Sequence, residues 1–504
     1  MRQNHLSPAL LCGVAAAVPA ACAAQQGAGG RESGRPNIVY IMTDDHAYQT
    51  VGAYGHPISR LAPTPNIDRL AREGMLFREA FVENSISAPS RATLLTGVYS
   101  HRHGQTTLSY GIMDTTLVHF PELLRAEGYR TAIFGKWHLS IEPKGFDHYD
   151  LLWDQGEYYN PVMRTPETGG RYVRQEGYAT DIITDHALAW LDGHRDDDAP
   201  FCLMIHHKAP HRNWMADLKY LDLYEDVEFP EPETLFDDYA TRGDQMRQLT
   251  IDRHMGYAFD FKVEELKDEP TLQYIHDSWD IAMSTLTPEQ RRVWDDSYGR
   301  KNRDFLADRP EGKELLRWKY QRYIHDYCRT IRSVDDQIGR VLDYLEENGL
   351  MDNTLIVYTS DQGFLLGEHG LYDKRFMYEE SFRTPLIMAW RGHIRPGTVC
   401  RELVQNIDYA PTLLDAAGVE VPDGMDGVSL QPLFRSGKAR GWRTSLYYQY
   451  YDYPAVGSVR AHYGIRTDRY KLIHWFGPGA DGDPDIDFWE LYDLRKDPCE
   501  VHNV

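Results

Sequence analysis

The stretch that decides the fold is NIVYIMTDD, residues 37–45. Its five consecutive apolar residues, 38–42, are followed by Thr43 and then directly by Asp44 and Asp45. A short continuous apolar run is typical of a strand that is buried on both faces of a parallel sheet. The two carboxylates would then lie at the carboxyl end of the strand, where open α/β sheets bind their ligands.

The same pattern occurs three more times. Residues 129–134 lead to Gly-Lys-Trp-His at 135–138, residues 201–205 lead to a histidine-rich segment at 206–211, and residues 354–358 lead to Asp361 and Gln362. Amphipathic stretches that predict helices lie between these runs, for example at 181–192 and 327–348. We therefore expect an α/β fold with a large, mostly parallel or mixed sheet flanked by helices, whose polar clusters converge on one site.

The composition changes after Gly427. Aromatic strand-like runs at 444–451, 463–466 and 470–475 predict a small antiparallel sheet in a C-terminal subdomain. The stretch from about Asp217 to Arg317 shows no clear strands and predicts an insertion over the main sheet. The division that we expect is a signal peptide at 1–24, an α/β catalytic domain at 35–426 and a C-terminal subdomain at 427–504.

The first residues have the pattern of a secretory signal. Arg2 precedes an apolar run at 8–18, and small residues follow at 20–24. We expect an exported protein of the periplasm or cell surface, either soluble or lipid-anchored at Cys22. No other apolar stretch approaches the roughly 20 residues of a membrane helix, so no transmembrane segment is expected.

Charge and cysteine content narrow the function further. The 504 residues contain 54 Lys and Arg against 76 Asp and Glu, a net charge of −22. This excess of acid argues against a nucleic-acid or anionic-membrane partner, so an anionic ligand must meet a local basic pocket. Four cysteines lie beyond the signal, and the sequence leaves open whether Cys328 pairs with Cys400.

Acidic and amide side chains follow two of the predicted strands. Asp44, Asp45, Asp361 and Gln362 together form a hard oxygen set that suits Ca²⁺ or Mg²⁺ better than Zn²⁺. The alternative is that the aspartates only cap the helices that follow. Three converging carboxylates would repel one another without a cation, which favours a metal site.

The segment Ser87-Ala88-Pro89-Ser90-Arg91 continues as ATLLTG, residues 92–97. Pro89 suits the first turn of a helix and Gly97 its end, so Ser87 would lie just before a helix amino terminus, where an anion is favoured. The alternative is that Ser87 or Ser90 is an ordinary helix cap.

This segment resembles the signature of the type I sulfatases of the alkaline phosphatase superfamily, in which the first residue, Cys or Ser, is oxidised to formylglycine. The serine form here is similar to that of bacterial glycan sulfatases. The resemblance covers nearly the whole exported chain and includes further motifs at 37–45, 135–138, 208–214, 360–363, 366–370 with Lys374, and 463–467.

The resemblance implies a role for each matching residue. One Ca²⁺, or less suitably Mg²⁺, would be bound by Asp44, Asp45, Asp361, Gln362 and the oxygen of modified Ser87. Arg91 would hold the formylglycine hydrate. The sulfate would be surrounded by Lys136, His138, His211 and Lys374. One hydroxyl of the hydrate would attack sulfur, and the other would expel sulfate as the aldehyde reforms. Gln362 departs from the family pattern, in which Asn or His is commoner. A serine-type sulfatase-maturing enzyme is the implied partner.

The resemblance also implies a sulfated carbohydrate as substrate. We favour exolytic removal of the 6-O-sulfate of N-acetylglucosamine in host glycans such as heparan sulfate or mucin. His462 and Arg466 are candidates for contacting the sugar, and the alternative is that both are ordinary strand residues of the C-terminal subdomain.

Two other functions remain open from the sequence. One is a phosphodiesterase or phosphonate monoester hydrolase of the same superfamily, because a phosphoryl group has nearly the shape of a sulfuryl group. The other is an exported glycan-binding protein without turnover, which would result if Ser87 is never oxidised.

Overall fold

A computed structural model describes residues 34–504 except 196, 244–247, 272–275 and 480–483. The predicted signal peptide and Cys22 lie outside the described residues. Residues 35–504 form one compact unit, so the expected boundary at 427 stays a prediction.

The centre of this unit is a ten-stranded sheet with the order β13-β2-β12-β9-β1-β8-β4-β5-β6-β7. Its strands are β1 (Asn37–Thr43), β2 (Met75–Phe77), β4 (Arg130–Gly135), β5 (His148–Leu152), β6 (Val162–Arg164), β7 (Val173–Arg174), β8 (Phe201–His206), β9 (Thr354–Ser360), β12 (Leu386–Ala389) and β13 (Thr398–Cys400). The four predicted strands are confirmed as β1, β4, β8 and β9, which are neighbours and run parallel. Because β12, β6 and β7 pair antiparallel, the sheet is mixed.

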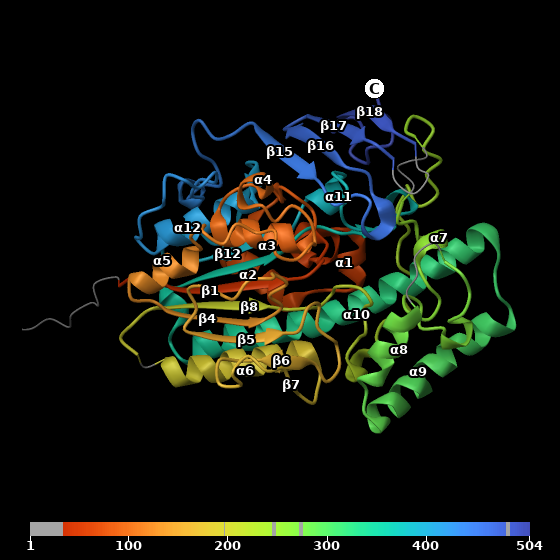
Figure 1. The fold of residues 1–504 in the computed structure, drawn as a ribbon, viewed down its shortest axis with the longest axis horizontal. Coiled ribbons are helices and arrows are strands. Elements are labelled where there is room, and N and C mark those ends of the chain that lie inside the picture. Colours follow the sequence, from red (N-terminus) through yellow and green to blue (C-terminus); the bar gives the residue numbers. More distant parts are fainter. Residues whose placement is uncertain (1–33, 196, 244–247, 272–275, 480–483) are drawn as a thin grey trace, which may run out of the picture. The chain divides into compact units, whose positions relative to one another are not determined.

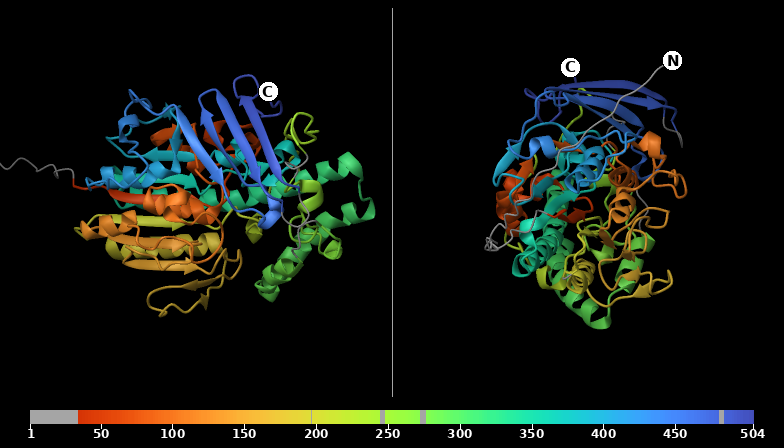
Figure 2. Two further views of the ribbon diagram at one scale, coloured as in Figure 1. Left: turned by 45° about the horizontal axis from the view of Figure 1, so that its top comes forward. Right: turned by 90° about the vertical axis from the view of Figure 1, so that its left-hand side faces the viewer.

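Helices cover both faces of the sheet (Figures 1 and 2). Successive residues of a strand point to opposite faces, so Val39 and Ile41 pack in one apolar cluster and Ile38, Tyr40 and Met42 in another. The first cluster is covered by α2 (Pro65–Glu73), α6 (Ala179–His194) and α10 (Gly312–Glu347), and the second by α3 (Ser87–Thr96), α5 (Phe120–Ala126) and α12 (Tyr409–Ala416). The α/β class is therefore confirmed.

The segment from 217 to 317 contains only helices among its described elements. These are η3 (Leu218–Tyr220), α7 (Ile251–His254), η5 (Glu264–Leu266), α8 (His276–Ser284), α9 (Pro288–Ala307) and the start of α10. The helix predicted from Tyr327 begins earlier, at Gly312. Its first four turns were not predicted because they are rich in charged and aromatic residues, and several of these pack against the insertion. None of the helices in the described residues combines the length and apolarity needed to cross a membrane.

The predicted C-terminal sheet is confirmed. It has four antiparallel strands, β15 (Ser445–Tyr450), β16 (His462–Thr467), β17 (Tyr470–Gly477) and β18 (Ile486–Asp493), shown in blue in Figure 2. Strand β18 was not predicted from the sequence because acidic residues lie between its apolar residues. Trp475 and Tyr492 point inward and are fully buried, which fixes the sheet against the main body.

Short elements complete the fold. They are α1 (Pro57–Leu61), α4 (Ser100–His103), α11 (Glu379–Phe382), β3 (Ala80–Phe81), β10 (Leu365–Leu366), β11 (Tyr372–Asp373) and β14 (Val404–Gln405). The four cysteines beyond residue 33 are all free, so Cys328 and Cys400 do not pair.

Candidate active site

The acids that follow β1 and β9 lie side by side. The two strands are paired in parallel with Thr43 opposite Ser360, so the residues that follow each strand emerge at the same edge. The backbone N–H of Asp45 donates to Asp361 Oδ1 at 3.2 Å. Asp44, Asp45 and Asp361 are all buried. The predicted convergence of these residues is what the structure shows.

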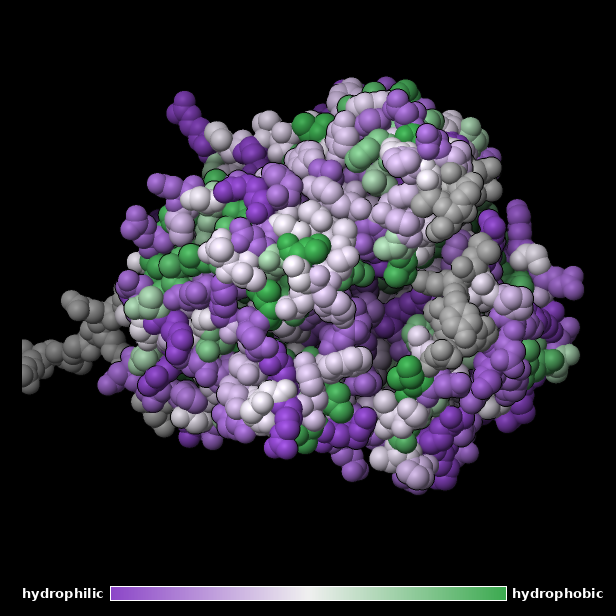
Figure 3. Space-filling model, viewed as in Figure 1, coloured by the Kyte–Doolittle hydropathy of each residue, from purple (hydrophilic) through white to green (hydrophobic). Residues whose placement is uncertain are grey.

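Each of the three carboxylates has its own cation. Lys136, which follows β4, donates to Asp44; Arg91 donates to Asp361 Oδ2 at 3.0 and 3.2 Å; and Lys374 Nζ lies 2.6 Å from Asp45 Oδ2. Five segments far apart in the sequence therefore meet at one buried cluster of six charges. In Figure 1 the parallel strands run from left to right, and the same view in Figure 3 shows a hollow with hydrophilic walls beyond their carboxyl ends.

These cations do not fully compensate the acids. Burial raises the pKa of Asp45 to about 7, although Lys374 opposes it, and burial with the repulsion of Asp44 raises the pKa of Asp361 to about 6. Burial also disfavours ionised Asp44, but the charges of Lys136 and Arg91 outweigh it and hold the pKa of Asp44 well below its usual range. Further positive charge would therefore stabilise the ionised cluster.

Gln362 completes a donor set that fits a divalent cation. Its Nε2 donates to Asp45, while its Oε1 is buried and has no hydrogen-bond partner. Amide nitrogen and oxygen are interchanged by a half-turn of the side chain, which would add Oε1 to the carboxylate oxygens. Ligand atoms of Asp44, Asp45 and His211 also lie within 4.8 Å of one another. A metal site is thus compatible with the residues present.

Ser87 points at this cluster from the start of α3. Its Oγ donates to Asp44 Oδ1 at 3.1 Å, and only 2% of the residue is exposed. The helix begins at Ser87 itself, slightly earlier than predicted, and ends at Gly97, whose φ of +67° suits glycine. Ser90 donates to the backbone carbonyl of Asp361, and Arg91 Nη1 donates to that of Lys136 at 2.7 Å. These bonds fix the helix start against three strand ends.

Two histidines border the cluster. Gln155, a residue that no sequence motif indicated, lies between Lys136 Nζ (2.5 Å) and His138 Nε2 (2.7 Å). His211 Nε2 lies 3.7 Å from Asp45 Oδ2, and its Nδ1 lies 2.7 Å from the carbonyl oxygen of Arg212. Burial and nearby cations hold the pKa of both imidazoles well below the usual value, so both are neutral in this arrangement.

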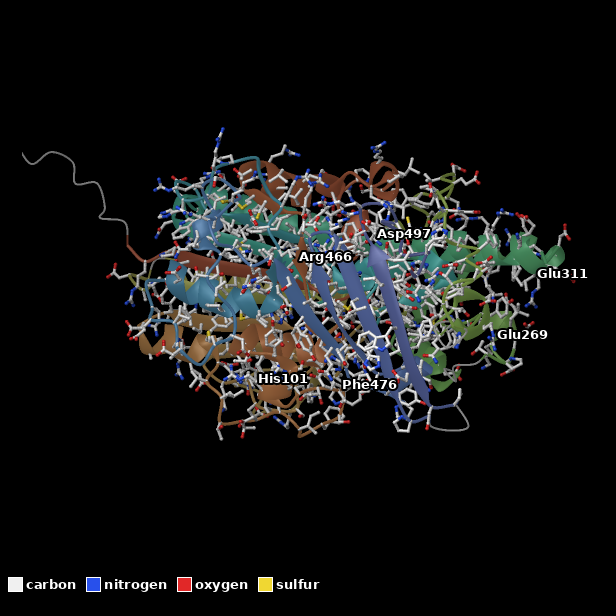
Figure 4. The ribbon with its side chains drawn as sticks, turned by 90° about the horizontal axis from the view of Figure 1, so that it is seen from above. His101, Glu269, Glu311, Arg466, Phe476 and Asp497 are labelled. Carbon is white, nitrogen blue, oxygen red and sulfur yellow. The ribbon has the colours of Figure 1, made fainter. Side chains whose placement is uncertain are left out.

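His462 and Arg466 lie apart from this cluster. His462 is fully buried among Tyr448, Tyr450 and Trp475, with Nδ1 bonded to a backbone carbonyl at 2.8 Å. Arg466 is paired with Glu79 and Glu379 at 2.7 and 3.1 Å. Figure 4 places Arg466 and Phe476 toward opposite ends of the small sheet. The side chains of His462 and Arg466 therefore both have partners within the protein, and we leave these two residues out of the proposed site.

A cavity of about 290 Å³ adjoins the cluster at His211. Its walls come from the loop after β5, the segment after β8 and helix α8, and they include Trp153, Gln155, Lys208 and Asn213. A pocket with mixed apolar and polar walls beside reactive groups is where a small organic substrate binds.

A mixed α/β sheet with acids, cations and a buried serine at its strand ends defines a hydrolase of the alkaline-phosphatase type. Sequence profiles match two sulfatase regions, "Sulfatase" at residues 36–419 and "N-sulphoglucosamine sulphohydrolase, C-terminal" at residues 367–504. The chain belongs to the sulfatase family and is a sulfuric ester hydrolase. Family membership implies a metal-binding site and a formylglycine.

Individual relatives agree with this assignment. The chain is 44% identical to an N-acetylglucosamine-6-O-sulfatase of Bacteroides thetaiotaomicron, over 98% of this chain and 86% of the relative. It is 28% identical to human N-acetylglucosamine-6-sulfatase, over 93% and 81% of the two chains. A solved structure of BT4656 in complex with its substrate D-glucosamine-2-N,6-O-disulfate is 44% identical, covers 93% of each chain and has a TM-score of 0.85.

Proposed function

We propose that this sulfatase removes the 6-O-sulfate from glucosamine or N-acetylglucosamine units of sulfated glycans such as heparan sulfate or mucin. The observation that carries the proposal is the 44% identity to an N-acetylglucosamine-6-O-sulfatase along nearly the full chain, together with the sugar-sized cavity beside the acid cluster. The motif pattern at the amino terminus supports an exported enzyme of the periplasm or cell surface.

We propose Asp44, Asp45, Asp361, Gln362 and the modified Ser87 as ligands of one Ca²⁺. The donor set supports calcium over magnesium, because a buried site made only of protein oxygens suits the larger ion, whereas Mg²⁺ usually keeps several waters. When bound, the cation lowers the pKa of a ligand hydroxyl, and oxidised Ser87 supplies that hydroxyl as an aldehyde hydrate.

The chain's own cations hold the sulfate. Lys136 and Lys374 each lie at one of the acids and can shift a hydrogen bond toward a sulfate oxygen. Arg91, which is fixed by Asp361 and by the backbone carbonyl of Lys136, lies one helical turn after position 87 and holds the hydrate there. Charge-assisted hydrogen bonds of this kind stabilise the negative charge as it moves to the departing oxygen.

His211 is the group that we propose to protonate the departing sugar oxygen. It lines the cavity. Because Nδ1 donates to a carbonyl oxygen, the neutral ring has no proton on Nε2. The negative charge of a bound sulfate ester raises the pKa of the imidazole, so Nε2 takes up a proton from solvent and passes it to the departing sugar oxygen. His138 is less suited, because its Nε2 is bonded to Gln155.

Oxidation of Ser87 requires a maturing enzyme that acts before folding. Ser87 lies 2% exposed at the start of a buried helix, so no enzyme reaches it in the folded protein. We propose a serine-type sulfatase-maturing enzyme as this partner.

The test is desulfation of a defined panel by protein made together with its maturing enzyme. The panel holds glucosamine and N-acetylglucosamine sulfated at O6 or O3, galactose 6-sulfate, and the matching 6-phosphates, with released sulfate or phosphate measured. We expect turnover of the 6-O-sulfated glucosamines at least 100-fold above every other member. Preference for a phosphate ester or for galactose would contradict the proposal.

A further inference from the structure

The cavity beside the active site contains a lysine with no acid partner. Lys208 follows β8, is 5% exposed, and its Nζ lies 4.8 Å from the ring centre of Tyr158. Among the described residues no carboxylate lies within ion-pair distance of this ammonium. A nearly buried cation is costly unless it is paired, so a vacant anion position is expected next to it.

The other cation of the cavity is already neutralised. Arg212 is held by Asp260 through two hydrogen bonds of 2.6 Å, and the carboxylate of this pair is fully buried while the arginine side chain is 11% exposed. Lys136 and Lys374 are likewise bonded to Asp44 and Asp45. Among the described residues, Lys208 is therefore the cation of this cavity that has no carboxylate within ion-pair distance, although the charges of Asp44, Glu157 and Asp45 act on it from farther away.

Two further polar groups of the same cavity have no partner. Asn213 is 5% exposed and its Nδ2 donates to nothing, and Glu157 Oε2 is buried without a donor. Trp153 stands at the rim with about half of its surface exposed. An amide donor, a carboxylate acceptor and an exposed aromatic ring around one cavity are the groups that bind sugar hydroxyls and sugar faces.

We propose that Lys208 and Asn213 form a second anion subsite, which binds an additional negatively charged substituent of the same sugar whose sulfate is removed. The inference rests on the proposed function and deepens it: the preferred substrate is a disulfated sugar rather than a monosulfated one. Glu157 accepts from a ring hydroxyl, and Trp153 covers one face of the sugar.

The experiment compares glucosamine 2-N,6-O-disulfate with N-acetylglucosamine 6-O-sulfate. Wild-type matured enzyme should favour the disulfate in kcat/KM, and Lys208→Met should lower that preference about 10- to 100-fold, mainly through KM, because a charge-assisted bond made in the bound state is lost. Lys208→Arg should restore most of the preference. Lys438→Met, a change at an exposed lysine between η9 (Gln431–Leu433) and β15, is the matched control and should not alter it.

Binding to protein with unconverted Ser87 gives a second readout by calorimetry. The ratio of the two dissociation constants should fall toward 1 in Lys208→Met, and Asn213→Ala should reduce it several-fold, which keeps the test decisive if Lys208→Met does not fold. Equal losses on both sugars would assign Lys208 to the departing sulfate and overturn the subsite. If wild type cleaves neither sugar, the proposed function fails, while the binding ratio still decides the subsite.

Discussion

Calcium binding should depend steeply on pH. Asp45 and Asp361 have pKa values raised to about 7 and about 6, chiefly by burial, and both must be ionised to act as ligands. At pH 5 the protonated form exceeds the ionised form about 100-fold for Asp45 and about 10-fold for Asp361. Apparent affinity should therefore fall about 1000-fold between pH 8 and pH 5, or about 4 kcal/mol. Carboxyls with the ordinary value of 3.8 would change it less than about twofold.

Isothermal titration of Ca²⁺ into protein with unconverted Ser87 measures this effect. In buffers of different ionisation enthalpy, binding at pH 6 should release about 1.4 protons, about 0.9 from Asp45 and about 0.5 from Asp361. Asp45→Asn should bind more weakly and keep only the tenfold contribution of Asp361, while His369→Ala serves as a control with the wild-type pH dependence. An affinity that changes less than threefold from pH 8 to pH 5, without proton release, would refute the reasoning.

Calcium-free protein should show the corresponding trend in stability. Because the folded-state pKa values of Asp45 and Asp361 exceed the ordinary 3.8, the folded protein binds more protons than the unfolded chain between about pH 4 and 7. The free energy of unfolding then falls as pH rises through that window. Asp44, with a lowered pKa, titrates below it. The gain in Tm on adding Ca²⁺ should thus be larger at pH 8 than at pH 6.

Five further changes test individual residues. Protein with unconverted Ser87 should fold and bind Ca²⁺ with unchanged Tm but turn over less than 1% as fast as converted protein, whose Ser87 peptide is lighter by two hydrogens; equal turnover would exclude the aldehyde hydrate. Asp361→Ala should abolish turnover and Ca²⁺ binding, whereas His369→Ala, which loses a buried partner of Asp237 at 2.8 Å, should cost about 1–3 kcal/mol of stability and keep Ca²⁺. His462→Ala should leave a buried cavity and Arg466→Met should leave two glutamates unpaired, so each should lower the free energy of unfolding in urea by about 3–5 kcal/mol. A rise in KM without loss of stability would instead favour the prediction that these residues contact the sugar.

Motif residues at strand ends could be placed from the sequence because parallel pairing leaves little freedom. Once 37–42 and 354–358 are recognised as buried strands, Asp44 and Asp361 must emerge at one edge of the sheet. The same logic located Lys136 after β4 and His211 after β8. Lys374 was the least constrained, since it lies beyond the two-residue strand β11, yet it reaches Asp45.

Residues outside such motifs could not be placed in this way. Gln155 bridges Lys136 and His138 from a loop whose course depends on the packing of β5 and β6. The sugar contacts predicted for His462 and Arg466 came from the resemblance of the C-terminal run to that of glycan sulfatases, and such a resemblance does not say which face of a strand turns inward. The register of the strands decides which face turns inward: His462 pairs with Trp475 and faces the core. The cavity residues near α8 could be recognised only from the structure.

The charge arrangement explains how a protein with a net charge of −22 binds an anionic sugar. Lys136, Lys374 and Arg91 are each bonded to one carboxylate, so the six groups nearly cancel and leave little positive potential for a sulfate. A divalent cation held by the acids would take over part of their charge, which would free Lys136, Lys374 and Arg91 for the sulfate oxygens. Lys208, which has no carboxylate within ion-pair distance among the described residues, adds positive charge on the cavity side. Because the net charge of −22 repels a sulfated chain, favourable contact is expected where these cations gather at the strand ends.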